Sequence, residues 1–317
     1  MKKSLIALAA VAASGFAMAQ SSVTLYGVAD VAVGYNSDKG PNANIEKKTA
    51  ARANSIFNNG TSRIGFRGVE DLGGGLKANF QFEQGVSLAD GSTQAKTFAR
   101  QAWVGLSGDF GTLRLGRQLT PSFNGIAAWE ITGTANYSVV ANQFGYAGAG
   151  SRDDAMIQYI TPNFGGFKAH LAYVLEDNRG TDEKYDLALI YGNGPFKAAL
   201  TYANTGEGKA NASVGASYDF KFAKVAASYF DGHYNYMRNA SFDGFSVGAS
   251  IPFNNFSLTF DVARNSEFKD TDFVVEGKYA LSKRTFVYAM YLNDGKKFTR
   301  DSNTGKNNFS VGLRHNF

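Results

Sequence analysis

The side chains with the clearest chemistry in this sequence are arginines that interrupt apolar, extended segments. Arg63 precedes Ile64, and Arg114 lies between Leu113 and Leu115. Successive side chains of a strand point to opposite faces, so both arginines are expected on the face away from the apolar residues. Guanidinium groups gathered in a confined space with low-dielectric walls attract anions. The pattern therefore predicts an electrostatic role.

Other charged residues extend this polar face. Glu83 has the parity of Gln81, and Arg152 has the parity of Gln158. Glu130 is the single charge of a long loop. A simpler interpretation applies to each arginine taken alone, namely a polar interior that pairs its own arginines with Asp or Glu. The cluster as a whole favours a role in selecting ions by charge.

Patterns typical of enzymes and metal sites are missing from the sequence. The histidines, His170, His233 and His315, are scattered without the spacing of metal ligands. There is no G-x-S-x-G nucleophile motif. The Gly148–Gly150 stretch lacks the lysine of a phosphate-binding loop, and the acidic link 177–183 fits no EF-hand. We expect no catalytic residue, no metal and no cofactor.

The elements that position these charges are strands in which apolar and polar residues alternate. The clearest of them are 23–35, 76–83, 196–202, 256–262 and 309–317. Such alternation is typical of strands with one apolar and one polar face. The chain is also rich in glycine and aromatic residues, and only 5 residues are proline. The composition favours many short strands over helices.

Two kinds of connection join the strands, short turns and long polar links. The seven short turns are Glu70–Gly75, Gly108–Gly111, Pro162–Gly166, Gly192–Pro195, Asp219–Phe222, Pro252–Asn255 and Ala280–Arg284. The long links include 36–60, 177–183, 232–241, 265–270 and 294–307. Seven short turns alternating with eight long links predict sixteen strands.

An even number of strands, with short turns at one end and long loops at the other, is typical of a transmembrane antiparallel β-barrel. Phenylalanines gather at the short turns, where such a barrel has an aromatic girdle; they are Phe110, Phe164, Phe167, Phe196, Phe220, Phe253 and Phe256. A secreted soluble β-sandwich also alternates, but it hides its apolar face and has no need of aromatic turns. The fold prediction is an all-β barrel of about 16 strands.

The N-terminus is typical of an exported protein. Lys2 and Lys3 precede an apolar run, and Ala17-Met18-Ala19 has the form of a cleavage site. We expect a signal peptide over 1–19 and one barrel domain over 20–317. Loss of the two lysines lowers the formal net charge from +5 to +3, which is too mild for a nucleic-acid-binding surface. The chain has no cysteine, so disulfides do not hold it together.

The stretch Leu119–Ser151 does not fit the strand pattern. It contains no Lys, Arg or Asp, and it carries several aromatic residues, among them Trp129 and Tyr137. Disordered segments are poor in aromatics. We find no helical apolar stripe in it and expect a loop without secondary structure of its own. A sixteen-stranded barrel encloses more space than its side chains fill, so the loop is predicted to fold inward and narrow the bore.

Several segments of this chain resemble the Gram-negative general diffusion porins. They are Ser21–Asp30, Ser62–Glu83, Arg100–Gln118, Tyr159–Phe167, Tyr279–Thr285 and Gly312–Phe317. The resemblance spans the chain from Ser21 to its end. It implies a homotrimer of sixteen-stranded barrels, each with its third long loop folded into the pore, that lets ions and small hydrophilic solutes diffuse passively, often with a preference for anions.

The resemblance also implies roles for particular residues. The wall arginines of the family match Arg63, Arg100 and Arg152, and its wall glutamate matches Glu83. The terminal Phe317 resembles the outer-membrane assembly signal of such porins.

Arg100 gives conflicting signals. Strict alternation places it with Ala102 and Val104 on the lipid side, whereas the resemblance places it in the pore. A bulge near Gln101 would reconcile the two; otherwise Arg100 lies beyond the membrane band.

The loop also departs from the family pattern, which often has several acids there. Glu130 is alone in this loop, with Asp153 and Asp154 at its return. We expect a constriction tilted toward positive potential, unless these aspartates and Glu83 neutralise it.

These observations predict an outer-membrane general diffusion porin with weak to moderate anion selectivity. Its partners would be outer-membrane lipid, small ions and hydrophilic solutes, and a second and third copy of itself, with no nucleic acid. The alternative is a plugged barrel that acts as a structural anchor or adhesin. An outer-membrane enzyme would need a His, Asp and Ser cluster at the rim, which the sequence does not offer.

Overall fold

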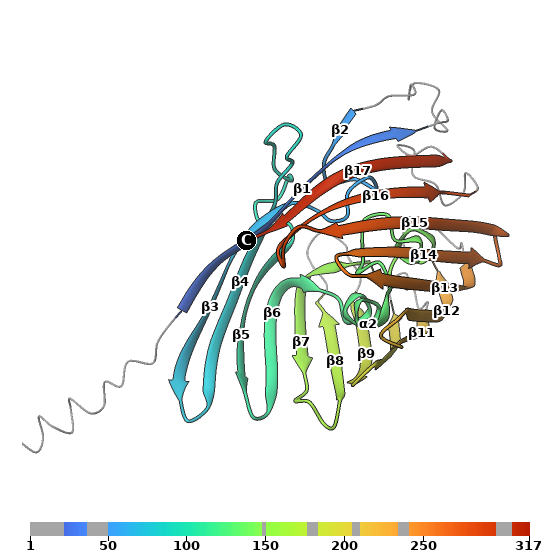
Figure 1. Cartoon of the computed structure of the whole chain (residues 1–317). Helices are drawn as coiled ribbons and strands as arrows, with labels where there is room; N and C mark the ends of the chain where they lie inside the picture. The colour runs from blue at the N-terminus through green and yellow to red at the C-terminus, as the bar shows by residue number, and fades with distance from the viewer. Residues whose placement is uncertain are drawn as a thin grey trace, which may run out of the picture.

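The chain folds into one antiparallel β-barrel in a computed structural model that describes residues 22–36, 50–147, 150–175, 183–204, 210–233, 241–295 and 306–317. All strands belong to a single sheet, and the first strand pairs with both the last strand and the third, which closes the sheet on itself (Figure 1). The predicted signal peptide, 1–19, lies outside the described residues.

The strands have the following bounds. They are β1 (Ser22–Asn36), β2 (Ala50–Arg52), β3 (Arg63–Gly73), β4 (Leu76–Gly85), β5 (Gln101–Gly108), β6 (Gly111–Leu119), β7 (Arg152–Ile160), β8 (Phe167–Val174), β9 (Lys184–Asn193), β10 (Phe196–Asn204), β11 (Ala210–Asp219), β12 (Lys224–His233), β13 (Ser241–Phe253), β14 (Phe256–Asn265), β15 (Asp270–Ala280), β16 (Thr285–Asn293) and β17 (Asn307–Asn316). Each short turn predicted from the sequence lies at the junction of two consecutive strands, although most of them overlap a strand end, and Glu70–Gly75 overlaps β3 by four residues.

The predicted barrel of sixteen strands is confirmed, with one short strand added. β2 pairs with β1 at Ala32–Gly34, whereas β3 pairs with the same strand at Ser22–Val28. β2 and β3 therefore occupy one position in the wall, interrupted by residues 53–62, which we call the inward turn. The sequence predicted only a polar link here, but Phe57 of this turn is 2% exposed and belongs to the core.

The two faces of the wall are reversed with respect to a soluble protein. In β14, Phe260 is 48% exposed, while its neighbours Thr259 and Asp261 are each 2% exposed. The phenylalanines at the short turns are all at least 38% exposed. An apolar outer band with an aromatic girdle and a polar interior is what a barrel in a lipid bilayer requires. The described residues include no helix with the length and apolar content needed to cross a membrane.

The described part of the long loop, 120–147 with 150 and 151, lies inside the barrel and, contrary to expectation, contains helices. They are α2 (Pro121–Trp129) and α3 (Val139–Phe144). The side chains of Thr120 and Ser138 cap them by accepting hydrogen bonds from the backbone N–H of Phe123 and Ala141, at 3.1 and 3.3 Å. Helices of nine and six residues are too short to produce a recognisable apolar stripe.

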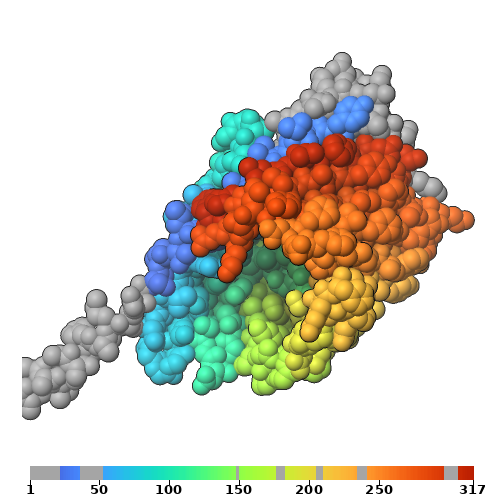
Figure 2. Space-filling model, in the orientation of Figure 1, coloured from blue at the N-terminus to red at the C-terminus, as the bar shows by residue number. Residues whose placement is uncertain are grey.

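The two helices of the loop pack against one side of the barrel. Trp129 is 1% exposed, and the ring of Phe144 stacks on Phe230 of β12 with their centroids 4.4 Å apart. Gly215 of β11 makes room for Trp129, because a Cβ there would lie 2.1 Å from the indole. Full burial of an aromatic side chain contributes about 1.5–3 kcal/mol. Apolar burial therefore holds the loop on β9–β15 and leaves the wall across from it uncovered. Figure 2 shows the surface hollowed between the orange and the green strands.

Candidate functional site

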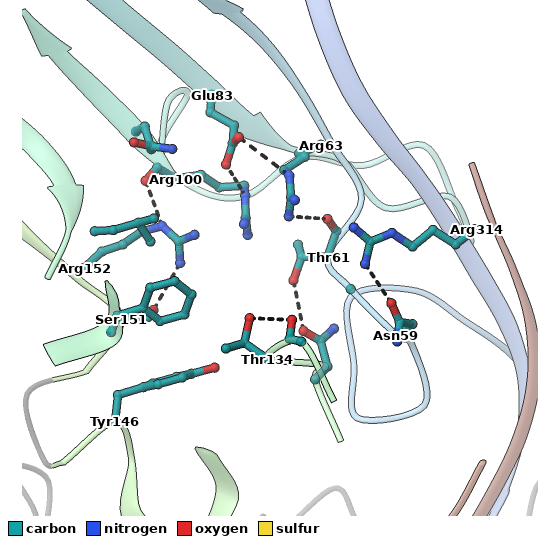
Figure 3. A pocket seen from close by; sticks show the side chains of 16 residues that line it. Asn59, Thr61, Arg63, Glu83, Arg100, Thr134, Tyr146, Ser151, Arg152 and Arg314 are labelled. Carbon is teal, nitrogen blue, oxygen red and sulfur yellow. Dashed lines mark hydrogen bonds and ion pairs between the residues drawn. The ribbon is translucent and has the colours of Figure 1, made fainter. Parts of the chain in front are cut away.

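The uncovered wall, the inward turn and the loop enclose a cavity of about 370 Å³, which we call the constriction cavity. Its charged lining residues are Arg63, Glu83, Arg100, Arg152 and Arg314. Figure 3 shows the four arginines on the wall side, with Thr134 and Tyr146 of the loop across from them. The cavity therefore carries four guanidinium groups and one carboxylate.

Glu83 organises two of the arginines. Its Oε1 lies 2.7 Å from Nε of Arg100, and its Oε2 lies 3.6 Å from Nε of Arg63. The hydroxyl of Tyr26 donates a further hydrogen bond to Oε2 at 2.9 Å. One carboxylate is thus shared by two guanidinium groups, so half of their positive charge remains unbalanced.

Arg152 is held by neutral acceptors. Its Nε donates to the backbone carbonyl of Arg100 at 2.8 Å, and its Nη1 donates to Oγ of Ser151 at 3.0 Å. These contacts orient the guanidinium without neutralising it. Arg63, Arg100, Arg152 and Glu83, all named from the sequence, are therefore brought together in one cavity.

Arg100 reaches the cavity without the expected bulge. Strand β5 begins at Gln101, and the pairing of Lys77–Glu83 with Gln101–Ser107 is continuous. Arg100 lies just before the strand, where alternation no longer sets the direction of its side chain, and it is 9% exposed. The conflict between alternation and resemblance arises because alternation was extended one residue too far.

Arg314 is a lining residue that the sequence reasoning did not select. Its Nη1 donates to Oδ1 of Asn59 in the inward turn at 2.7 Å. The parity signal was present, because Arg314 lies between Leu313 and His315 on the polar face of the last strand. What the sequence could not reveal is that the inward turn meets β17.

Arg114 lies elsewhere in the lumen. It lines a second cavity, together with Lys168 and His170, and its guanidinium carbon lies 4.2 Å from the centre of the Trp103 ring. The structure therefore separates Arg114 from the other candidate arginines.

Glu130 is used within the loop. It is 3% exposed and accepts hydrogen bonds from the hydroxyls of Thr132 and Ser138, at 2.6 and 2.7 Å, and from the backbone N–H of Thr134 at 2.6 Å. Three donors on one carboxylate stabilise the connection between α2 and α3. Glu130 does not line the constriction cavity, so it does not face the arginines as expected.

The two aspartates at the loop's return have other partners. Asp153 pairs with Lys184 at 3.0 Å, and Asp154 pairs with Arg117 at 2.8 Å and Lys96 at 2.6 Å. They therefore do not neutralise the arginines of the constriction cavity.

The loop side of the cavity is neutral. Its lining residues include Phe123, Thr134, Asn136 and Tyr146. Burial, assisted by the nearby Glu130 carboxylate, raises the pKa of Tyr146 to about 12, so the phenol carries no charge at neutral pH. All formal charge of the cavity lies on the wall and the electrostatic field is one-sided. Within the described ranges, no group of three or more His, Cys, Asp or Glu is arranged to hold a metal ion.

A closed barrel with an inward loop and a charged constriction defines the class of pore-forming outer-membrane proteins. Comparison with known proteins agrees. The family model described as Gram-negative porin matches residues 5–314, and the chain belongs to this family. The predicted family, fold and outer-membrane location are confirmed, and the protein is an outer-membrane porin for passive diffusion of ions and small hydrophilic solutes.

Individual relatives extend this result. The chain is 40% identical over 246 residues to outer membrane porin protein 32 of Delftia acidovorans, covering 71% of this chain and 68% of the relative. It is 32% identical over 349 residues to major outer membrane protein P.IB of Neisseria lactamica, covering both chains fully. Among solved structures, the anion-selective porin from Comamonas acidovorans is 26% identical and superposes with a TM-score of 0.77, covering 94% of this chain and 100% of that one.

Proposed function

We propose that this porin prefers anions and that Arg63, Arg100, Arg152 and Arg314 set the preference. The observation that carries the proposal is the charge of the constriction cavity, where four guanidinium groups face a single carboxylate. Clusters of arginine in a pore favour anions because the low-dielectric wall focuses their field into the bore. Glu83 balances one of the four charges, which leaves an excess of three.

The surroundings of the cavity support this reading. The acidic residues nearest in sequence, Glu130, Asp153 and Asp154, are bound to other partners, and the opposite side of the cavity is neutral. The similar porin from Comamonas acidovorans is described as anion-selective. Screening has a length of about 10 Å at 0.1 M salt, so the preference is expected in dilute salt and fades in molar salt.

We also propose that the chain assembles into a homotrimer and that the pore catalyses no reaction. Membership of the porin family supports a homotrimer embedded in outer-membrane lipid, which a mass measurement in mild detergent would test. The pore acts without a catalytic step, so solutes leave it unchanged.

The decisive experiment is the reversal potential of single channels in a gradient of dilute KCl. The wild type should show a chloride-selective reversal potential. The double variant Arg63→Glu with Arg152→Glu should move it toward potassium. A matched control is Lys283→Glu with Arg284→Glu, which makes the same charge change on an exposed short turn and should leave the potential nearly unchanged.

Two outcomes would overturn the proposal. A wild type that already prefers potassium in dilute KCl would show that the excess of arginines does not control selectivity. A double variant that behaves like the control would show that the cluster is not the filter.

A further inference from the structure

A second basic cavity lies in the lumen toward the short turns. It has a volume of about 610 Å³, and its basic lining residues are Lys77, Arg114, Lys168 and His170. We call it the lower cavity. Because short turns lie on the periplasmic side of such barrels, a solute that has passed the constriction meets this cavity before it leaves the pore.

The pairing of the strands explains how these residues meet. One row of inward positions runs across five neighbouring strands through Lys77, Ser107, Thr112, Ile160 and His170. The next row toward the constriction contains Asn79, Gly105 and Arg114. Gly105 has no side chain, and a Cβ there would lie 3.1 Å from Cγ of Arg114, so the glycine makes room for the Arg114 side chain.

The two cavities are far enough apart to act separately. Lys77 lies six residues before Glu83 on strand β4, and the row of Arg114 lies four residues before it. At the rise of a strand these separations are roughly 20 Å and 13 Å. Both exceed the screening length of about 10 Å at 0.1 M salt. The charges of the lower cavity therefore form their own electrostatic site.

The polar groups of the lower cavity are short of partners. Nε of Arg114 and Nδ1 of His170 are buried and have no hydrogen-bond partner. Within the part of the chain that the structure describes, no carboxylate lies within 4.0 Å of Lys77, Arg114 or Lys168. The one carboxylate that lines the cavity belongs to Asp109, which is exposed on the turn between β5 and β6.

Arg114 is also held in a fixed orientation. Its guanidinium lies over the ring of Trp103, whose Nε1 donates to Oε1 of Gln101 at 3.0 Å. A planar guanidinium stacked on an aromatic ring keeps its edge free for paired hydrogen bonds to two oxygen atoms. Lys77 and Lys168 are exposed to the lumen and add mobile point charges.

We propose that the lower cavity is a binding site for small divalent oxyanions. The fork of Arg114 would take two oxygens of the anion, the ammonium groups of Lys168 and Lys77 would balance its second charge, and the hydroxyls of Ser107 and Thr112 line the same space. Three cations opposed by a single carboxylate at the rim favour a doubly charged anion over chloride. The proposal rests on the anion-conducting pore described above and adds a second anion site to it.

The test measures block of chloride current by sulfate, which remains divalent at neutral pH. Sulfate is added to each side of a single wild-type trimer in turn, and the apparent Kd is taken from the fall in current. Saturable block is expected from the side of the short turns. The variant Arg114→Gln with Lys168→Gln should raise the apparent Kd by at least about tenfold, because a charge-assisted hydrogen bond is lost.

A matched control removes two other lysines at the same end of the barrel. Lys197→Gln with Lys224→Gln makes the same charge change on inward positions of β10 and β12 that do not line the lower cavity. Block in this variant should stay within about twofold of wild type, as expected for screened charges. Lys168 is exposed, so Lys168→Gln alone provides a variant that should fold even if Arg114→Gln does not.

The results separate the two proposals. Equal block in the wild type, the test variant and the control, or block from neither side, would overturn the lower cavity as a site while chloride selectivity persists. A wild type that prefers potassium would overturn the proposed function, whatever sulfate does.

Discussion

The two sides of the lumen differ in the residues that line them and in what those residues do. The side formed by β9–β15 is covered by the long loop, whose Trp129 and Phe144 pack against Phe230 of β12. The side formed by β3–β7 is bare and carries three of the four arginines of the constriction cavity, and the fourth, Arg314, lies on β17. Apolar burial fixes the size of the opening, and charge sets what passes through it. The comparison predicts that size and selectivity can be changed separately.

Deletion of most of the long loop should have the largest effect on the size of the pore. Deletion of residues 125–145 takes away most of the loop while leaving the arginine wall in place. Single-channel conductance and the rate of sugar entry into liposomes should rise clearly, because the bore is then limited by the barrel itself. A deletion of 88–92, in an exposed loop outside the cavity, serves as the control. Unchanged conductance in a folded deletion variant would show that the loop does not limit the pore.

Weakening the packing between the long loop and the wall should have a smaller effect than deleting the loop. Trp129→Ala creates a cavity where the indole packs against Gly215, and such a change typically costs about 3–5 kcal/mol. We expect a lower melting temperature in detergent and a noisier open-channel current. Phe123→Ala is the matched control, because this aromatic of α2 contacts Tyr146 and is only half-buried. Equal losses in both variants would argue against apolar packing as the anchor of the loop.

Changing the charged side should leave conductance similar and alter selectivity. Glu83→Gln removes the only carboxylate of the constriction cavity and raises its excess of positive charges from three to four. The reversal potential in dilute KCl should move further toward chloride. Glu267→Gln removes a carboxylate from an exposed link between β14 and β15 and should move it little. A shift toward potassium in Glu83→Gln would mean that Glu83 holds the arginines in their selective arrangement.

The smallest effect should come from pH. The pKa of Tyr146 is raised to about 12, so its phenol is neutral below that value and adds a negative charge only above it. Ionisation of Tyr146 should therefore not change selectivity between neutral pH and about pH 10. Tyr146→Phe should follow the same profile over this range. A divergence between the two profiles near neutral pH would show that Tyr146 ionises more readily than its burial implies.

The sequence predicted the wall better than its interior. Arg63 and Arg152 both line the cavity, but a register shift between β6 and β7 separates Arg152 from Gln158, so alternation does not explain its direction. Alternation placed Arg63 correctly because the direction of a side chain within a regular strand depends only on its position. It failed at Arg100, which lies one residue outside its strand. Glu130 looked like a pore residue because it is the only charge in its loop, yet its donors lie within the same loop. Loop conformation depends on such local contacts, which have no period that can be read from sequence.

The helices of the loop and the inward turn were missed for a related reason. Both are short, and both are stabilised by contacts with distant strands. The inward turn is bound by Asp30 on β1, whose carboxylate accepts hydrogen bonds from Gly60 N–H at 2.8 Å and from the Tyr288 hydroxyl at 2.6 Å. Residues 229 positions apart thus meet at one point, because the backbone N–H of Asn59 donates to the Tyr288 hydroxyl oxygen. No local pattern predicts such a meeting.

The inward turn has a consequence for how the barrel is assembled. The first and last strands close the cylinder, with Asp30 directly opposite Arg314. The inward turn touches both partners of this closing pair: it donates to Asp30 from Gly60 and accepts from Ser310 and Arg314 through Phe57 and Asn59. A slip of one residue at the closing pair would turn Arg314 toward lipid and break these bonds together. These hydrogen bonds form together only when β1 and β17 pair in the native register, so the inward turn stabilises the correct closure of the barrel.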